Sequence, residues 1–387
     1  MKLSNFSQSR DNNFNLIRIT AALAVLITHS FVLATGSINA EPLREYLGMS
    51  IGDIAVNIFF ITSGFLVTAS LLTRQSVIEF VWARVLRIFP ALVIMLLLTV
   101  FGMGIFFTSL PVSDYLANSE VYIYFVKCAS LITEVPYNLP GVFVHNPLRY
   151  MVNGSIWTMP YEIKMYAILV AVWGGLLLIN RERIKLFKRV IITGVIVSGA
   201  IVFMGKFYYA TIENLVLKFS IDGEFITLFF MFFSGATFYF LKEYIRLSHS
   251  LFWLCMIALV VATAINKDVF FVTYMLTIAY ILFYIAYVPS GYIRKYNQVG
   301  DYSYGVYIYA FPIQQSLAAL VPGISVLHML LISAAVTLIF ATLSWHLIER
   351  RALNLKSLYV DHTKNTLTSN PNVSSTRVAD VTPSQRK

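Results

Sequence analysis

Two ionisable side chains stand in the first apolar stretch of the chain, where a membrane makes charge costly. Arg18 and His29 are eleven positions apart, which on a helix places them within roughly 20° around the axis and about 16 Å along it. A cation near the cytoplasmic surface and an acid–base group beyond the midplane suit a ligand threaded along one helix. We therefore predict that both face one cavity. The alternative is that Arg18 extends to the interface and His29 bonds a neighbouring helix.

A second pair of cations, Arg84 and Arg87, stands directly before the apolar sequence Ile88-Phe89-Pro90. Residues three apart lie on one face of a helix, and the planar guanidinium group binds phosphate oxygens in a forked geometry. Together with Arg18, the pair predicts a phosphate site at the cytoplasmic end of the molecule. The alternative is an ordinary cationic anchor at the membrane surface.

Polar and aromatic residues mark the entrance to a later apolar stretch. The segment reads Asn153-Gly154-Ser155-Ile156-Trp157-Thr158-Met159-Pro160-Tyr161-Glu162. A carboxylate beside two aromatic rings resembles a carbohydrate platform, in which rings stack on sugars and the carboxylate accepts hydroxyl groups. We therefore predict that Glu162, Trp157 and Tyr161 bind an acceptor at or just inside the outer interface. The alternative for Glu162 is a plain charge at the water boundary, because Lys164 faces about 200° away on a helix.

A late segment, 300–307, is typical of the start of a helix. It contains Asp301 and Ser303, which are residue types that cap helices, and the small Gly305, which allows close helix contact. We predict a mostly structural role for it. No pair of histidines has metal-ligand spacing, and the H-E-x-x-H and G-K-[ST] motifs do not occur in the sequence, so no metal site is predicted.

Helices in a membrane must position these residues, because the composition excludes a water-soluble core. Of the 387 residues, 58% are hydrophobic and only 12% are charged, against about 25% charged in an ordinary soluble domain. A cytosolic enzyme, a disordered protein and a disulfide-rich module are thereby excluded. The sequence predicts an all-α, polytopic integral membrane helical bundle with about ten transmembrane helices. The predicted spans lie near 14–35, 51–72, 88–109, 160–179, 190–206, 224–241, 250–265, 268–288, 303–320 and 325–347.

The basic residues give the orientation. They gather in alternate loops, which the positive-inside rule assigns to the cytoplasm, so both termini are predicted to be cytoplasmic. The net charge of +10 is then mainly a topology signal, and nucleic acid is not an expected partner. The first helix is interpreted as an uncleaved span.

Two further segments are interpreted as lying outside the spans. The longest outer loop covers 110–155, and its apolar stretch Val121–Val135 is too short to span, which predicts a re-entrant or interfacial segment. The chain then divides into a transmembrane domain, 1–355, and a disordered cytoplasmic tail, 356–387.

Taken together, these motifs resemble the membrane acyltransferase 3 family. The matching positions, in chain order, are Arg18 with His29; Asp53 and Asn57 to Leu66; Arg84, Arg87 and Ile-Phe-Pro; Asn153 to Glu162; Gly300 to Tyr307; and Trp345 with Glu349. The resemblance covers about 12–355, and the order of the motifs makes it specific. Many relatives carry His where Ala310 stands and Pro where Arg351 stands, so no role is predicted for these two positions.

The resemblance implies a membrane-bound O-acyltransferase of the bacterial inner membrane. Such enzymes move an acyl group, usually acetyl, from cytoplasmic acyl-CoA to a carbohydrate hydroxyl at the outer face. Arg84 and Arg87 would hold the phosphates of acetyl-CoA, Arg18 would guide the pantetheine arm or its phosphates, and no cofactor would be permanently bound. His29 would be the general base or a transient acyl carrier. The residues implied to bind or orient the sugar are Asn153, Ser155, Trp157, Tyr161 and Glu162.

Other functions stay open at this point. The acceptor would be an envelope glycan, such as lipopolysaccharide O-antigen, exopolysaccharide or a lipid-linked precursor. A transporter or flippase would also be polytopic with buried ionisable residues, and a larger acyl group such as succinyl would need the same motifs. The sequence does not specify the oligomeric state.

Overall fold

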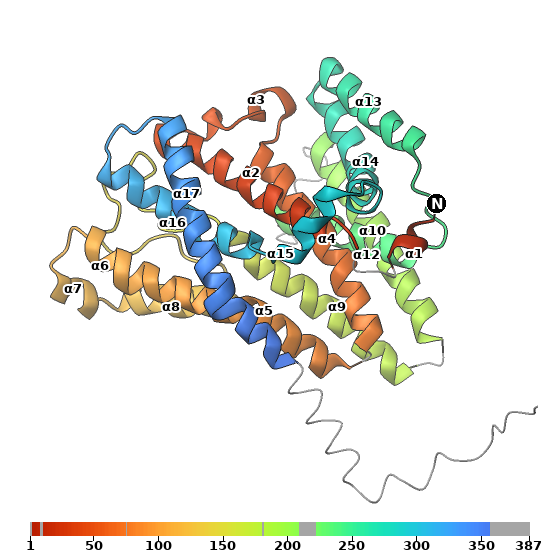
Figure 1. Ribbon diagram of the computed structural model, residues 1–387, viewed down its shortest axis with the longest axis horizontal. Coiled ribbons are helices and arrows are strands. Elements are labelled where there is room, and N and C mark those ends of the chain that lie inside the picture. The colour runs from red at the N-terminus through yellow and green to blue at the C-terminus, as the bar shows by residue number, and fades with distance from the viewer. Residues whose placement is uncertain (1, 8–10, 75, 180–181, 209–221, 357–387) are drawn as a thin grey trace, which may run out of the picture.

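The computed structural model describes residues 2–7, 11–74, 76–179, 182–208 and 222–356. Within these ranges the chain is all-α, with only isolated backbone bridges and no strand. The predicted fold class, an all-α polytopic membrane bundle, is confirmed (Figure 1). The tail predicted to be disordered lies, from residue 357 on, outside the described residues.

Every predicted span contains a helix. The long helices are α2 (Phe14–Thr35), α4 (Ile51–Arg74), α5 (Val77–Leu97), α9 (Met159–Ile179), α10 (Arg183–Phe207), α12 (Gly223–Phe240), α13 (His249–Ile265), α14 (Lys267–Tyr287), α16 (Ser303–Leu320) and α17 (Val326–Ser344). The short helices are α1 (Leu3–Phe6), η1 (Ile38–Ala40), α3 (Arg44–Leu47), α6 (Gly104–Phe107), α7 (Val112–Ala117), α8 (Ser119–Ser130), η3 (Ile156–Thr158), η4 (Tyr292–Lys295) and α15 (Tyr296–Val299).

Seven of the described helices are long and apolar enough to cross a membrane. The total of about ten crossings and the cytoplasmic position of the termini remain predictions. The apolar stretch in the long outer loop forms α8, whose twelve residues are too few for a crossing.

Two long helices contain a wider, π-helical turn. The segment η2 (Leu98–Met103) continues α5 into α6, and η5 (Trp345–Glu349) continues α17. A π-helical turn inserts a residue into the helical register and is frequent at functional sites. In both helices the side chains within the π-helical turn, from Leu98 in one and up to Glu349 in the other, therefore leave the angular positions that a regular α-helix would give them.

The helices α4 and α12 cross at their backbones. A Cβ atom on Gly64 would lie 1.8 Å from the carbonyl oxygen of Phe232, and one on Gly235 would lie 2.0 Å from that of Ile61. Only glycine fits at these two positions, as in small-residue helix contacts within membranes. This crossing fixes the middle of α4, which carries Ser63.

The outer loop enters the bundle alongside α16. Asn146 donates to the backbone and side-chain oxygens of Gln315 at 2.8 and 2.6 Å, and Thr158 is 2.6 Å from the Tyr307 hydroxyl. The two partners on α16 are eight positions apart, or about 12 Å in depth. Segment 146–158 therefore descends toward the end of the bundle predicted to face the cytoplasm, and α9 begins inside the protein.

Candidate functional site

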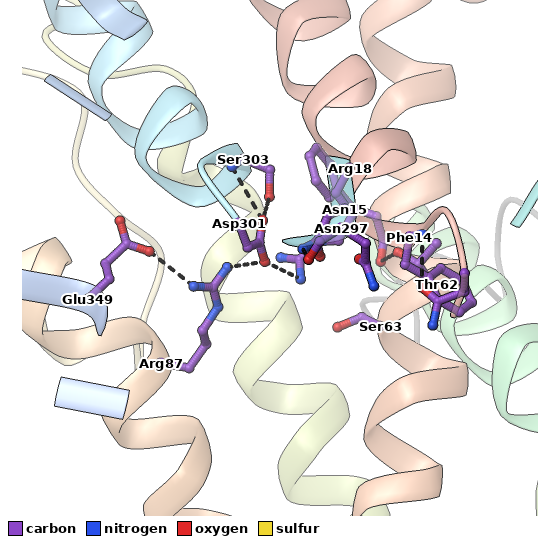
Figure 2. A network of polar contacts seen from close by, with 12 residues as sticks. Phe14, Asn15, Arg18, Thr62, Ser63, Arg87, Asn297, Asp301, Ser303 and Glu349 are labelled. Carbon is purple, nitrogen blue, oxygen red and sulfur yellow. Dashed lines mark hydrogen bonds and ion pairs between the residues drawn. The ribbon is translucent and has the colours of Figure 1, made fainter. Parts of the chain in front are cut away.

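Charged residues from four separate elements meet at the end of the bundle predicted to be cytoplasmic (Figure 2). One carboxylate oxygen of Asp301 lies 3.0 Å from Arg18 Nη1 and 2.5 Å from Arg87 Nη2. The other terminal nitrogen of Arg87 lies 3.0 Å from Glu349, whose second oxygen accepts from Ser344. The network ties α2, α5, the start of α16 and η5 together.

Asp301 both caps a helix and holds the two arginines. Its other carboxylate oxygen accepts from the backbone N–H and the hydroxyl of Ser303, as the sequence predicted for a helix start. Burial alone would raise its pKa, but Arg18 and Arg87 outweigh burial and lower the pKa of Asp301 to about 2. The segment 300–307 therefore holds the structure in two ways, because Asp301 caps α16 and is also the centre of the charge network.

A partly open cavity lies beside this network. It is bounded by α2, α4, α5, α9 and α16. Its charged and hydrogen-bonding lining includes Arg18, Ser63, Arg84, Arg87, Glu162 and Tyr166. All three arginines predicted to form a phosphate site thus face one cavity.

Arg84 differs from Arg87 in how its charge is balanced. Its guanidinium carbon lies 6.0 Å from the ring centroid of Phe80 and 5.9 Å from that of Tyr166. Its Nε is buried and has no hydrogen-bond partner among the described residues, and no carboxylate there lies within ion-pair distance. An orphaned donor on a cation at a cavity wall is costly unless an anion completes it.

Glu162 lies inside the cavity and not at the outer interface as predicted. Because segment 146–158 descends into the bundle, the first turn of α9 begins deep in the protein. The carboxylate of Glu162 accepts hydrogen bonds from Ser63, at 3.1 Å, and from Tyr166. Ser63 lies at the middle of α4, also 3.1 Å from the Tyr166 hydroxyl. These contacts join Glu162 to the arginine side of the site.

His29 lies on α2 and is not among the residues that line this cavity, so a cavity shared with Arg18 remains a prediction. Its Nδ1 is 3.5 Å from the Ser155 hydroxyl, and its ring meets the ring of Phe311 edge to face at 5.0 Å. Asn153 accepts from the Ser155 backbone and donates to Ile308 on α16. The inserted loop therefore brings its polar residues to His29 and anchors them there.

The two aromatic residues of the predicted sugar platform do pack together. The rings of Trp157 and Tyr161 lie 5.8 Å apart, nearly perpendicular, and the Tyr161 hydroxyl donates to Asp222 at 2.7 Å. Lys164 Nζ lies 4.9 Å from the Tyr161 ring centroid. Neither ring lines the cavity that holds Glu162, so the structure divides the predicted acceptor residues between two places.

Four residues that the sequence did not single out as site residues take part in this geometry. Ser63, Tyr166, Asp301 and Glu349 contact the predicted site residues directly. Asp301 and Glu349 carry a readable signal, since each is a carboxylate at the end of an apolar stretch that an arginine can reach. No group of three metal-ligating side chains occurs among the described residues.

Comparison with known proteins identifies the family to which the chain belongs. The model of a family described as an acyltransferase domain matches residues 11–346. An O-acetyl transferase of Shigella phage Sf6 is 30% identical over 365 residues, covering 90% of this chain and 98% of that protein. Nodulation protein 10 of Rhizobium leguminosarum bv. viciae is 34% identical over 180 residues, covering 43% of this chain and 46% of that protein. No solved structure matches.

Proposed function

Because the chain belongs to this acyltransferase family, we propose that it transfers an acetyl group from acetyl-CoA to an envelope carbohydrate. The donor enters from the cytoplasm, and a sugar hydroxyl at the outer side of a bacterial inner membrane accepts the group. The observation that carries the proposal is the cavity at the arginine-rich end, with His29 farther along the same helix as Arg18. A single helix thus connects an anion site with an acid–base group.

The donor is held through its phosphates. Arg84 has no carboxylate partner among the described residues, so its guanidinium is available to a phosphate group without breaking an ion pair. Arg18 and Arg87 share Asp301 and add positive potential next to it. The pantetheine arm then extends along α2, over the roughly 16 Å that separates Arg18 from His29.

Glu162 faces the donor in this proposal. A carboxylate has about four acceptor positions, and Ser63 and Tyr166 use only one of its two oxygens. The other oxygen can accept an amide N–H of the pantetheine arm. Trp157 and Tyr161 keep the role of a surface for the sugar ring, since both lie outside the donor cavity.

His29 performs the proton or acyl transfer, and two routes fit its position. As a general base, it takes the proton of the sugar hydroxyl while the oxygen attacks the thioester carbonyl, the C–S bond breaks and the thiolate leaves. As an acyl carrier, its nitrogen displaces the thiolate, and the sugar hydroxyl then displaces the imidazole. Ser155 and Phe311 hold the ring in place for either route.

The test is transfer of labelled acetyl from acetyl-CoA to an envelope glycan fraction by the purified protein in nanodiscs. His29→Ala should abolish transfer while the protein still inserts and unfolds normally. His328→Ala is the matched control, because His328 lies at the start of α17 and its ring hydrogen-bonds Ser325 alone among the described residues. Near-normal acetylation by His29→Ala would refute the mechanism. Formation of acetohydroxamate from acetyl-CoA and hydroxylamine that requires His29 distinguishes the carrier route, because the hydroxylamine takes the acetyl group from the imidazole. Succinyl-CoA in the same assay tests the larger acyl group.

A further inference from the structure

The donor cavity ends about one helical turn short of His29. On α16, Tyr307 lines the cavity, and Phe311, four positions farther along, contacts the His29 ring. Four positions correspond to about 6 Å along one face of a helix. The inserted loop covers the same interval, since Thr158 lines the cavity and Ser155 contacts His29. A donor that enters at the arginine-rich end must therefore cross this one turn to reach the imidazole.

Two aromatic rings close the cavity at this end. The ring of Phe59, on α4, meets the ring of Tyr307 edge to face, with the centroids 5.7 Å apart and the planes at 70°. The Tyr307 hydroxyl lies 2.6 Å from the hydroxyl of Thr158. Since all three side chains also line the cavity, the end nearest to His29 is closed by contacts between side chains.

The two rings differ in how firmly they are held. Tyr307 is only 9% exposed, and its hydroxyl is hydrogen-bonded to Thr158, which is 5% exposed. Phe59 is partly exposed, and its side chain contains no group that could form a hydrogen bond. A change of its rotamer loses packing contacts but leaves no polar group unsatisfied. Phe59 is therefore the member of the pair that can move.

We propose that Phe59 and Tyr307 form a size-selective gate through which the acyl end of the donor passes from the cavity to His29. This inference rests on the proposed function, because it concerns the passage of the same donor. The Phe59 ring swings aside, and the anchored Tyr307 ring forms the fixed edge of the opening. A compact acetyl group then passes with the pantetheine arm, whereas a branched acyl group is wider and is held back.

The first experiment measures how fast position 29 is reached from the arginine-rich end. The full-length protein with His29→Cys is placed in sealed vesicles, and a membrane-impermeant anionic methanethiosulfonate is added to one side at a time. We expect Phe59→Ala to raise the rate from the arginine-rich side about tenfold, because the closed state loses its aromatic contact. The rate from the opposite side should not change. Leu66→Ala is the matched control, since Leu66 lines the same cavity seven positions along α4 from Phe59.

Two results would overturn the proposal. One is the same rate from the arginine-rich side in Phe59→Ala, in Leu66→Ala and in the parent protein, whether that rate is fast or undetectable. The other is an equal rise from both sides in Phe59→Ala and in the more conservative Phe59→Leu, which would mean that the helices have loosened and that the ring is not the barrier.

A second measurement separates this inference from the proposed function. With His29 intact, kcat/KM is measured for isobutyryl-CoA and for acetyl-CoA with the same envelope glycan fraction. We expect Phe59→Ala to raise the ratio of the first to the second at least about tenfold, the lower end of what one methyl-sized difference in fit gives. Leu66→Ala should leave the ratio unchanged. No transfer of either group by wild type would refute the proposed function, whereas acetyl transfer with an unchanged ratio in Phe59→Ala would refute the gate alone.

Discussion

Replacing Asp301 with asparagine tests whether the charge network holds the arginine-rich end together. The substitution keeps the shape and leaves an oxygen to cap α16, but it removes the charge shared by Arg18 and Arg87. Their side chains are 26% and 14% exposed, and that of Asp301 is 13% exposed, so water compensates only partly. Two guanidinium groups would then share a buried position with Glu349 as the only remaining carboxylate of the network.

The magnitude follows from the pKa of the carboxylate. Burial raises the pKa, yet the two arginines and the hydrogen bonds from Ser303 lower it from the ordinary 3.8 to about 2. At about 1.36 kcal/mol per pKa unit this is a net stabilisation of the charged form by about 2 kcal/mol. Breaking a fully buried ion pair typically costs about 3–5 kcal/mol. Because Glu349 still pairs with Arg87, we expect a loss of about 2–3 kcal/mol in the free energy of unfolding.

The assay is reversible unfolding of the purified protein in mixed micelles, with Asp268→Asn as the control. Asp268 pairs with Lys206 at 3.3 Å, but their side chains are 58% and 40% exposed, and such pairs contribute about 1 kcal/mol or less. If Asp301→Asn loses no more stability than Asp268→Asn, the reasoning about the buried network is wrong.

Three other predictions concern the same end of the molecule and the helix crossing. Arg84→Ala should weaken acetyl-CoA binding about tenfold, which is the effect of one charge-assisted hydrogen bond, with little loss of stability. Arg87→Ala should weaken acetyl-CoA binding and also lower the free energy of unfolding. If titration calorimetry and unfolding give the same losses for both variants, this prediction is contradicted. Gly64→Ala should cost at least about 3 kcal/mol or prevent folding, because its Cβ would meet a backbone carbonyl at 1.8 Å, and normal thermal unfolding would contradict the crossing. The stability advantage of wild type over Asp301→Asn should be constant above about pH 5 and disappear as pH falls toward about 2. The reason is that a carboxylate with a lowered pKa contributes its full stabilisation only above the pKa of the unfolded state, about 3.9. A difference in unfolding free energy that stays the same between about pH 2 and 7 would contradict this.

The sequence predicted the helices well because each span is a continuous apolar stretch of sufficient length, which can be recognised from its own residues. The arginines at 18, 84 and 87 line one cavity, and the sequence had placed all three at the same end of the molecule, because helical spacing and alternating topology suffice to bring the ends of α2 and α5 together. Those two rules involve only the helices themselves, which is why they succeeded from one sequence.

The path of the outer loop could not be predicted in the same way. Glu162 was expected at the outer interface, but the descent of 146–158 depends on amide contacts such as Asn146 with Gln315, 169 positions apart. A hydropathy pattern contains no information about such a pair. Likewise, Asp301 has the residue type of a helix cap, and its second role depends on Arg18 and Arg87 approaching from two other helices.

The inserted loop also determines which part of the protein separates the cavity from the outside. Thr158 and Met159 form part of the cavity wall, and they follow a segment with no long helix of its own. That segment is held by side-chain hydrogen bonds from Asn146, Asn153 and Gln315, each worth about 1 kcal/mol. Val152 and Ile156 of the same segment are also fully buried. The barrier between the cavity and the outer side is therefore a packed loop and not a spanning helix.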